Sequence, residues 1–400
     1  NICSVKLGYQ VLLWAIRFSQ WRDKALTPRR LSLRIMPEWT VCGYRCGTRR
    51  LCVGADNDPF LRLRRQEREL CLTVSMAERE CSVTGEAAVP PGQPAPEDLL
   101  LWRLYPQVGS CQLVGNKLLV KGDVTLSALY RCQQQKLHTY TAVLPFSQIV
   151  ESPSGGEEGE VTVCPQLLCG EARLLRGEES SGFAVSAELR LLVRITRRET
   201  VACVTDLYSI RCAVQPDTEP VSLPPAQERP TRQEAAAHLD FGRQRPFVYV
   251  TDVSCAPAAA EDGAPCAAVR MRLLYLDETE APAVTERTAQ LPLRDGETCT
   301  RCGAPEVAFT GTGCDLRQAV SVTPAAGEPV VVTTVTAVQT VPEREEGRRP
   351  SLVMRRLAAD ETLWDAAKQY RTDEELIRAV NQLAEGEVPD KMLLIPRMRP

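Results

Sequence analysis

The sequence has very few histidines and no recognisable catalytic motif. Only His138 and His238 occur among its 400 residues. Gly-rich phosphate-binding loops are absent, and neither a nucleophile motif nor a pair of catalytic carboxylates can be assembled around either histidine. His138 falls in a β-like segment, where we expect a surface or hairpin residue and not a general base. The sequence therefore predicts a protein that is not an enzyme and uses no cofactor.

Long apolar runs are also missing. The run from Tyr9 to Phe18 is interrupted by Gln10 and Arg17, and no small-residue cleavage site follows it. It is too short for a membrane span and does not have the pattern of a signal peptide. We therefore predict no transmembrane segment.

Acidic side chains are scarce in the N-terminal segment. Residues 1–65 hold 13 Lys and Arg against 4 Asp and Glu, and the net charge of the whole chain is -3, so the remainder is acidic. An acidic body argues against nucleic-acid binding. The basic segment opens at Asn1 without an initiator Met. We treat residues 1–65 as uncertain, because a truncated or misread gene start explains them as well as a function does.

Phenylalanine is rare while proline is common, with 7 Phe and 29 Pro. This balance favours strands and turns over helical bundles, and the length suits several domains. The 17 cysteines are an odd number without a secretory signal. They do not indicate a disulfide framework, so we expect a reducing cytoplasm with thiols available for later cross-linking.

One cysteine pattern has the spacing of a site. Cys299 and Cys302 are separated by two residues, and Cys314 follows. This is half of a zinc knuckle, or a redox pair. No second pair of that spacing and no nearby histidine completes a four-ligand set. We favour scattered structural or cross-linkable thiols and predict no metal site, keeping a zinc or redox protein as the last alternative.

Three segments in the middle of the chain share one pattern. Residues 124–130, 189–195 and 269–275 each alternate apolar and polar side chains with period two, which predicts half-buried antiparallel strands. A turn signal and another β-rich run precede each of them, so the predicted unit is a hairpin. An extended segment with a Leu-Pro pair follows the first and third strands, at Leu144 and Leu291, and the second copy lacks it.

Polar and proline-rich stretches divide the repeats. We place linkers at residues 152–159, 215–232 and 342–350. The predicted organisation is an uncertain segment 1–65, three β domains at 66–151, 160–214 (incomplete) and 233–341, and a C-terminal unit at 351–397.

Residues 83–130 resemble the SPOCS domain, named for spore coat and SipL proteins. In that family a Val-Pro-Gly-Pro segment precedes an acidic-apolar stretch, and a glycine-bounded hairpin leads into a valine-rich strand. The resemblance covers about residues 66–150 well and the later copies weakly. The matching residues are Val89, Pro90, Gly92, Pro94, Asp98, Leu99, Leu100, Gly115, Leu119, Val120, Gly122, Val124 and Tyr130.

The C-terminal unit is predicted to be a compact β-α-α-β element. Leu363, Ala366, Ala367 and Tyr370 have helical spacing, with Thr362 as the cap and Asp365 completing a capping box. For the second helix we predict Thr372 as the cap with Glu375 at the box position, and an apolar stripe of Leu376, Ile377 and Val380.

This unit resembles the LysM domain. The match rests on Thr362-Leu363-Trp364, Ala367, Tyr370, Glu375-Leu376, Asn381, Leu383 and Leu393-Leu394-Ile395-Pro396; the usual Gly-Asp is replaced by Asp360-Glu361. LysM modules commonly bind N-acetylglucosamine polymers such as peptidoglycan through two loops. The resemblance gives the ligand-binding residues Asp360, Glu361, Thr362, Leu363, Asp390, Lys391 and Met392, with Leu363 or Met392 as an apolar platform. We expect Trp364 to pack in the small core.

SPOCS repeats before a terminal LysM domain are the order found in SipL-like spore-coat morphogenetic proteins. The resemblance implies a scaffold of the spore envelope, located in the mother-cell cytoplasm at the forespore surface, whose LysM domain docks a SpoIVA-like coat morphogenetic protein. The alternative is a peptidoglycan-binding accessory protein of the cell wall or cortex. Whether the repeats form homo-oligomers is left open.

Overall fold

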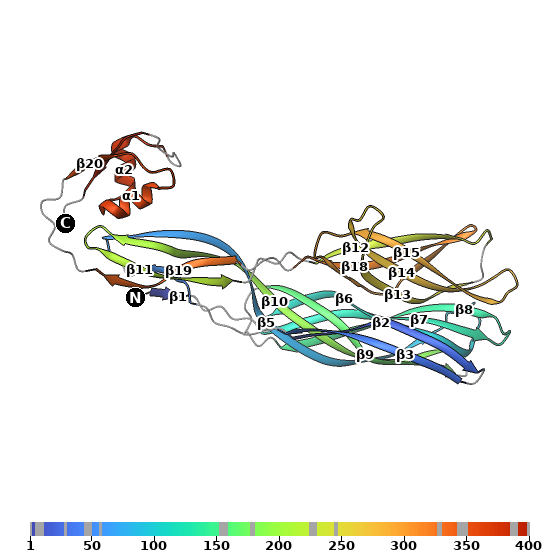
Figure 1. The fold of residues 1–400 in the computed structure, drawn as a ribbon. Helices are drawn as coiled ribbons and strands as arrows, with labels where there is room; N and C mark the ends of the chain where they lie inside the picture. Colours follow the sequence, from blue (N-terminus) through green and yellow to red (C-terminus); the bar gives the residue numbers. More distant parts are fainter. Residues whose placement is uncertain are drawn as a thin grey trace.

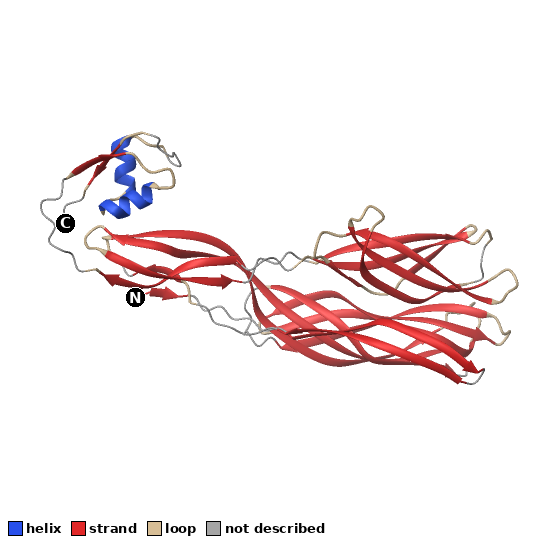
Figure 2. Cartoon of the chain, viewed as in Figure 1, coloured by secondary structure: helices blue, strands red, loops and turns tan. Residues whose placement is uncertain are grey.

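Antiparallel strands make up most of the chain, and both helices of the described residues lie near the C-terminus (Figure 2). The computed structural model describes residues 2–4, 12–27, 30–43, 50–55, 58–151, 159–176, 181–223, 230–243, 247–325, 330–341, 351–384 and 391–397. Side chains are described from residue 50 onward, except that of Val74. The prediction of a mainly β fold ending in a β-α-α-β unit is confirmed.

Two three-stranded sheets pack face to face in a first sandwich. One sheet has the order β5-β10-β9 and the other β6-β7-β8. The strands are β5 (Leu61–Ala88), β6 (Pro96–Val114), β7 (Lys117–Cys132), β8 (Leu137–Glu151), β9 (Glu160–Arg176) and β10 (Ser181–Ser209).

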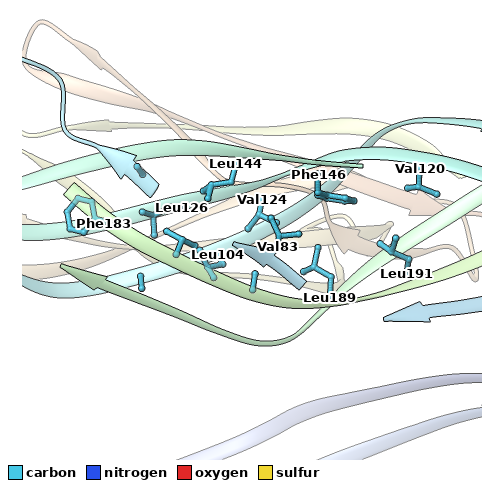
Figure 3. Packing of buried hydrophobic residues seen from close by; sticks show 14 of the residues in the cluster. Val83, Leu104, Val120, Val124, Leu126, Leu144, Phe146, Phe183, Leu189 and Leu191 are labelled. Atoms are coloured by element: carbon cyan, nitrogen blue, oxygen red, sulfur yellow. The ribbon is translucent and has the colours of Figure 1, made fainter. Parts of the chain in front are cut away.

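The predicted alternation decides which side chains fill this sandwich. In β7, Val124 and Leu126 are fully buried, and in β10, Leu189 and Leu191 are fully buried. Figure 3 shows these side chains meeting between the sheets. β7 and β10 are the central strands of their sheets. Because successive side chains of a strand point to opposite faces, the apolar row of each strand lies on the face that the other sheet covers.

A second sandwich is built in the same way. Its sheets have the orders β13-β14-β15 and β12-β18-β16, with β17 also paired to β18. The third predicted strand lies in β14, where Val269, Met271 and Leu273 are fully buried. The strands are β12 (Thr231–Asp240), β13 (Val248–Ala259), β14 (Pro265–Leu276), β15 (Pro282–Pro292), β16 (Thr298–Arg301), β17 (Glu306–Thr310) and β18 (Gly313–Thr323).

The three predicted hairpins are confirmed as β6-β7, β9-β10 and β13-β14. Gly115 has φ +59° in the first turn, a conformation that side chains disfavour. The second copy has no Leu-Pro strand, and β5 occupies the other side of β10 instead. Segments 66–151 and 160–214, predicted as separate domains, therefore contribute to one hydrophobic core.

The two sandwiches contact each other through a small apolar cluster. Leu129 of β7 packs with Phe247 and with Tyr249 of β13. The Tyr249 hydroxyl donates a hydrogen bond to the Ser127 carbonyl at 3.2 Å. Burial raises the pKa of Tyr249 to about 12, so its hydroxyl keeps its proton and remains a donor. Figure 1 shows the second sandwich lying along the β6-β7-β8 sheet.

Strands β5 and β10 pair over their whole length as a ribbon that runs through the first sandwich and continues beyond it. They contain 28 and 29 residues, which corresponds to roughly 90 Å at about 3.3 Å per residue. The far half of the ribbon packs against a small sheet, β11 (Val214–Leu223) with β19 (Val330–Thr340), and against β4 (Cys52–Ala55), which pairs with β1 (Ile2–Ser4).

The predicted linker at residues 215–232 is wrong in its first part. Strand β11 runs from Val214 to Leu223 and pairs with β19 over its whole length. Prolines are tolerated there because β11 is an edge strand, where a missing N–H removes no hydrogen bond if it faces outward. The linkers at 152–159 and 342–350 lie almost wholly outside the described residues.

Near the N-terminus, β2 (Leu12–Thr27) and β3 (Arg30–Gly43) form an antiparallel hairpin. The last unit consists of β20 (Leu352–Arg355), α1 (Leu363–Tyr370), α2 (Glu374–Asn381) and β21 (Leu393–Pro396). It lies beside the far end of the ribbon, away from the two sandwiches (Figure 1). We call these residues, 351–397, the C-terminal module.

Candidate functional site

The C-terminal module has a small core between its two-stranded sheet and its helices. Strands β20 and β21 are antiparallel, with Leu352 opposite Pro396. Ala366, Ala367 and Ile377 of the helices pack with Leu393 and Ile395 of β21, and all five are fully buried. The pairing of the two strands closes the predicted β-α-α-β element.

Asn381 holds the end of α2 to the start of β21. Its amide nitrogen donates to the Leu394 carbonyl at 2.6 Å, and its amide oxygen accepts from the Leu394 N–H at 2.8 Å. The same nitrogen donates to the Ile377 carbonyl at 2.8 Å. These contacts satisfy the polar groups of a strand that has only one partner strand. Asn381 is therefore structural in this module.

The predicted capping box of the first helix is confirmed. The Thr362 hydroxyl accepts from the Asp365 N–H, and the Asp365 carboxylate accepts from the Thr362 N–H at 2.9 Å. The Thr362 hydroxyl also donates to that carboxylate at 2.6 Å. These hydrogen bonds lower the pKa of Asp365, because they favour its charged form.

The predicted cap of the second helix is wrong by one residue. The N-cap is Asp373, whose carboxylate accepts from the Glu375 N–H, and not Thr372. Thr372 is fully buried, and its N–H donates to the Ala367 carbonyl at 3.0 Å, which closes the end of α1. Because the connection is so short, the residue that ends the first helix cannot also cap the second.

The first predicted ligand loop offers little to a sugar. Glu361 is bound to Arg355 at 2.6 Å and accepts from the Ala358 N–H. Leu363 is 4% exposed and belongs to the core, so it is not available as an apolar platform. Thr362 is occupied by its capping box. Asp360 is exposed.

The second predicted loop is described only in part. Residues 385–390, including Asp390, lie outside the described residues. Lys391 is exposed, and its ammonium group donates to the Asn381 carbonyl at 3.4 Å. Met392 is 55% exposed. Met392 therefore remains an accessible apolar side chain of the predicted set.

An apolar face on the outside of the β20-β21 sheet was not predicted. Leu352 is 51% exposed and Met354 is 63% exposed. Met354 lies opposite Leu394, and Met392 is two residues before Leu394 on the same side of the strand. We call Leu352, Met354, Met392 and Leu394 the outer face of the module.

The opposite side of the module is attached to the ribbon. The Trp364 indole N–H donates to the Asp206 carboxylate at 2.8 Å, and the Lys368 ammonium group lies 2.6 Å from the other oxygen of that carboxylate. The Trp364 ring meets the Tyr208 ring edge to face, with 4.9 Å between the ring centres. Trp364 was predicted to pack in the core; it contacts that core and also attaches the module to β10.

Two further polar contacts strengthen this attachment. The Arg62 guanidinium group of β5 donates twice to the Asp373 carboxylate, at 3.0 and 2.7 Å. The buried Tyr208 hydroxyl donates to the Thr372 carbonyl at 2.8 Å. Burial raises the pKa of Tyr208, so this donor keeps its proton. The only sequence signal for these contacts is the indole N–H of Trp364, which needs a partner when the ring is half-buried.

The SPOCS-like residues have structural roles in the first sandwich. The Tyr130 hydroxyl donates to the Pro94 carbonyl at 3.0 Å, which joins the proline segment to the valine-rich strand. Asp98 forms an ion pair with Arg131. A side chain at Gly122 would collide with the Gln107 carbonyl, 2.3 Å from its Cβ. The resemblance therefore rests on residues that shape the fold.

The three cysteines of the predicted pattern, Cys299, Cys302 and Cys314, have different surroundings in the structure. Cys299 and Cys314 are buried, and the Cys302 thiol faces the Thr300 carbonyl at 4.0 Å. Burial raises the pKa of the Cys314 thiol. In the described part of the chain, no three His, Cys, Asp or Glu side chains are grouped as a metal site would require.

A polar cleft of about 230 Å³ lies where the sandwiches approach each other. Gln107 lines it from the first sandwich, and Arg232, Glu234, Glu306 and Arg317 line it from the second. Arg317 and Glu234 are 3.7 Å apart. Since both signs of charge are present in pairs, the cleft favours neither an anion nor a cation, and we assign it no ligand.

Comparisons with known proteins agree with the SPOCS resemblance. The family model "SipL, SPOCS domain" matches residues 97–167, which comprise nearly all of β6, all of β7 and β8, and the start of β9. The model "Glycosyltransferase YibD, C-terminal domain" matches residues 1–36, of which the structure describes 2–4, 12–27 and 30–36, without their side chains. No curated protein and no solved structure matches the chain.

The SPOCS match points to a role related to sporulation. It covers less than a fifth of the 400 residues and leaves the C-terminal module outside. Each of the two helices has eight residues, and no helix in the described ranges is long and apolar enough to span a membrane.

Proposed function

We propose that the chain is a non-enzymatic scaffold of spore-envelope assembly, whose C-terminal module is a LysM-like unit that docks a coat morphogenetic protein. The SPOCS match over residues 97–167 supports the link to the spore coat. The observation that carries the docking role is the attachment of the module to the ribbon through Asp206, which leaves its outer face free.

The outer face suits a protein partner better than a sugar. Leu352, Met354 and Met392 are each more than half exposed and uncharged. Protein interfaces have apolar centres, and methionine adapts its shape to a partner surface. A sugar platform at Leu363 is not available, because that side chain lies in the core. The partner we infer is a SpoIVA-like coat morphogenetic protein, and the site of action is the forespore surface.

In this proposal, the sandwiches and the ribbon would determine where the C-terminal module is held. The ribbon is roughly 90 Å long at about 3.3 Å per residue, and it joins the SPOCS-containing sandwich to the module. A scaffold needs fixed spacing between attachment points. Contacts from both ribbon strands, through Arg62 and Asp206, supply a fixed attachment at one end.

The test is binding of the full-length chain to a purified SpoIVA-like protein. The double variant M354E/M392E places two carboxylates on the outer face, and V284E is the matched control, because Val284 of β15 is 62% exposed in the second sandwich. We expect the double variant to lose binding and the control to keep it. Equal binding by all three proteins would refute docking through the outer face.

Sedimentation with purified peptidoglycan distinguishes the proposed scaffold from the alternative, a peptidoglycan-binding protein. A wall-binding accessory protein would sediment with peptidoglycan and lose that ability in a Lys391→Glu variant. The proposed scaffold stays in the supernatant. Binding to peptidoglycan without binding to the coat protein would replace the proposal by the glycan alternative.

A further inference from the structure

Two cysteines of the second sandwich come together across its two sheets. Cys255 lies on β13, in the sheet β13-β14-β15, and Cys299 lies on β16, in the sheet that contains β18. Their sulfur atoms are 2.7 Å apart. The two residues are 44 positions apart in the sequence, so nothing in the local pattern paired them.

The partner of Cys299 is therefore not Cys302, with which it shares the two-residue spacing. The Cys302 thiol faces the Thr300 carbonyl. Cys299 and Cys302 are three positions apart. In an extended segment successive side chains alternate, so residues three apart point to opposite faces, whereas in a helical turn they would lie on the same face. The two-residue spacing drew attention to Cys299 but indicated Cys302 as its partner, whereas the structure places Cys255 beside it.

We propose that Cys255 and Cys299 form a disulfide that joins the two sheets of this sandwich at the β13 and β16 edge. A disulfide places its sulfur atoms about 2.05 Å apart, so a small rotation of either side chain completes the bond. Cys299 is 5% exposed, whereas Cys255 is partly accessible. A small oxidant therefore reaches Cys255 first.

The oxidant class is a low-molecular-weight disulfide such as oxidised glutathione. The Cys255 thiol loses its proton, and its thiolate attacks one glutathione sulfur, which releases one glutathione thiolate and forms a mixed disulfide. The Cys299 thiolate then attacks the Cys255 sulfur and releases the second glutathione. Two protein thiols are oxidised, one glutathione disulfide is reduced to two thiols, and the protons leave with the products.

This inference does not depend on the proposed function, since it concerns a sandwich away from the C-terminal module. Its consequence is mechanical. The bond would tie together two strands, β13 and β16, that belong to different sheets of this sandwich. It would restrict the unfolded chain and raise the resistance of the sandwich to denaturant.

Peptide mapping of the full-length protein tests the proposal. The protein is incubated with oxidised glutathione, remaining thiols are alkylated, and the chain is cut with trypsin. Cleavage after Arg294 and Arg301 isolates Cys299 from Cys302 in peptide 295–301, while peptide 244–270 carries Cys255 together with Cys266. We expect these two peptides to be joined, with two hydrogen atoms lost, and to separate after reduction.

The Cys266→Ser variant is the matched control, because it leaves Cys255 as the only thiol of its peptide. The joined pair should persist in C266S and disappear in C255S. We also expect oxidation to raise the denaturant midpoint of the natural protein and of C266S, with no shift in C255S. Full alkylation of both Cys255 and Cys299 after oxidation in the natural protein would overturn the proposal, whatever the variants do.

Discussion

The β5-β10 ribbon contacts the rest of the first sandwich and the C-terminal module through different interactions. In the first sandwich the ribbon contributes a continuous row of buried apolar side chains, from Phe183 to Ile195. Near its far end it meets the C-terminal module through directional polar contacts at Asp206 and Arg62, around one aromatic pair, Tyr208 with Trp364. The comparison teaches that one pair of strands can build a core at one end and position a separate module at the other.

The largest expected effect lies in the first sandwich. Leu189→Ala removes a fully buried side chain from the centre of the first sandwich. We expect the free energy of unfolding to fall by about 2–5 kcal/mol, since a core Leu leaves a cavity that the sheets fill only in part. Chemical denaturation measures this loss. The control Val284→Ala, at a 62% exposed position, should change stability by less than about 0.5 kcal/mol; equal losses would refute the core assignment.

The polar contacts between the ribbon and the C-terminal module should have a more local effect when they are removed. Asp206→Ala leaves the Trp364 indole N–H and the Lys368 ammonium group without their shared acceptor. We expect a loss of about 1–2 kcal/mol, at the lower part of the range for an unpaired polar group, because the site is partly exposed. Hydrogen–deuterium exchange should rise in residues 363–370 and remain unchanged in residues 181–195. A uniform rise in both would show that the two contact regions are not independent.

Within the module, the capping box gives a smaller effect with a pH signature. Thr362→Ala should cost about 1 kcal/mol of stability near neutral pH. Hydrogen bonds from Thr362 lower the pKa of folded Asp365, so their stabilisation is present above the ordinary Asp pKa and is lost as pH falls through the folded value. Denaturation across the acidic range should show the variant and the natural protein converging. A constant difference at all pH values would refute this role of Asp365.

Substitutions on the outer face of the module should have the smallest effect on stability. Met354→Gln and Met392→Gln change side chains that are 63% and 55% exposed. We expect each to alter the free energy of unfolding by less than about 0.5 kcal/mol. Thermal unfolding of the two variants checks this expectation. A large loss would mean that the outer face is packed against another part of the chain.

The sequence predicted the regular parts of the fold well. Alternation identified the central strands β7, β10 and β14, because burial on one face of a strand imposes a period of two. Helical spacing and Thr362 identified α1. The pairing of β5 with β10 was missed because those strands are far apart in the chain, and pairing between distant strands leaves no local pattern.

The candidate site was predicted only in part. The β-α-α-β module and its first cap follow from local residue patterns. Its orientation depends on Asp206 and Tyr208, which lie 158 and 164 positions before their partners Trp364 and Thr372. Leu363 was assigned to a ligand loop, but the structure places it in the core, since a unit this small must bury its large apolar residues.

The central claim is that Asp206 fixes the C-terminal module on the ribbon. The most direct measurement is the NMR signal of the Trp364 indole N–H in the full-length protein, assigned by its loss in Trp364→Phe. This proton should exchange slowly with solvent in the natural protein, and in Asp206→Ala its signal should move and exchange faster. A signal that exchanges as fast as an exposed indole, and is the same with and without Asp206, would contradict this claim.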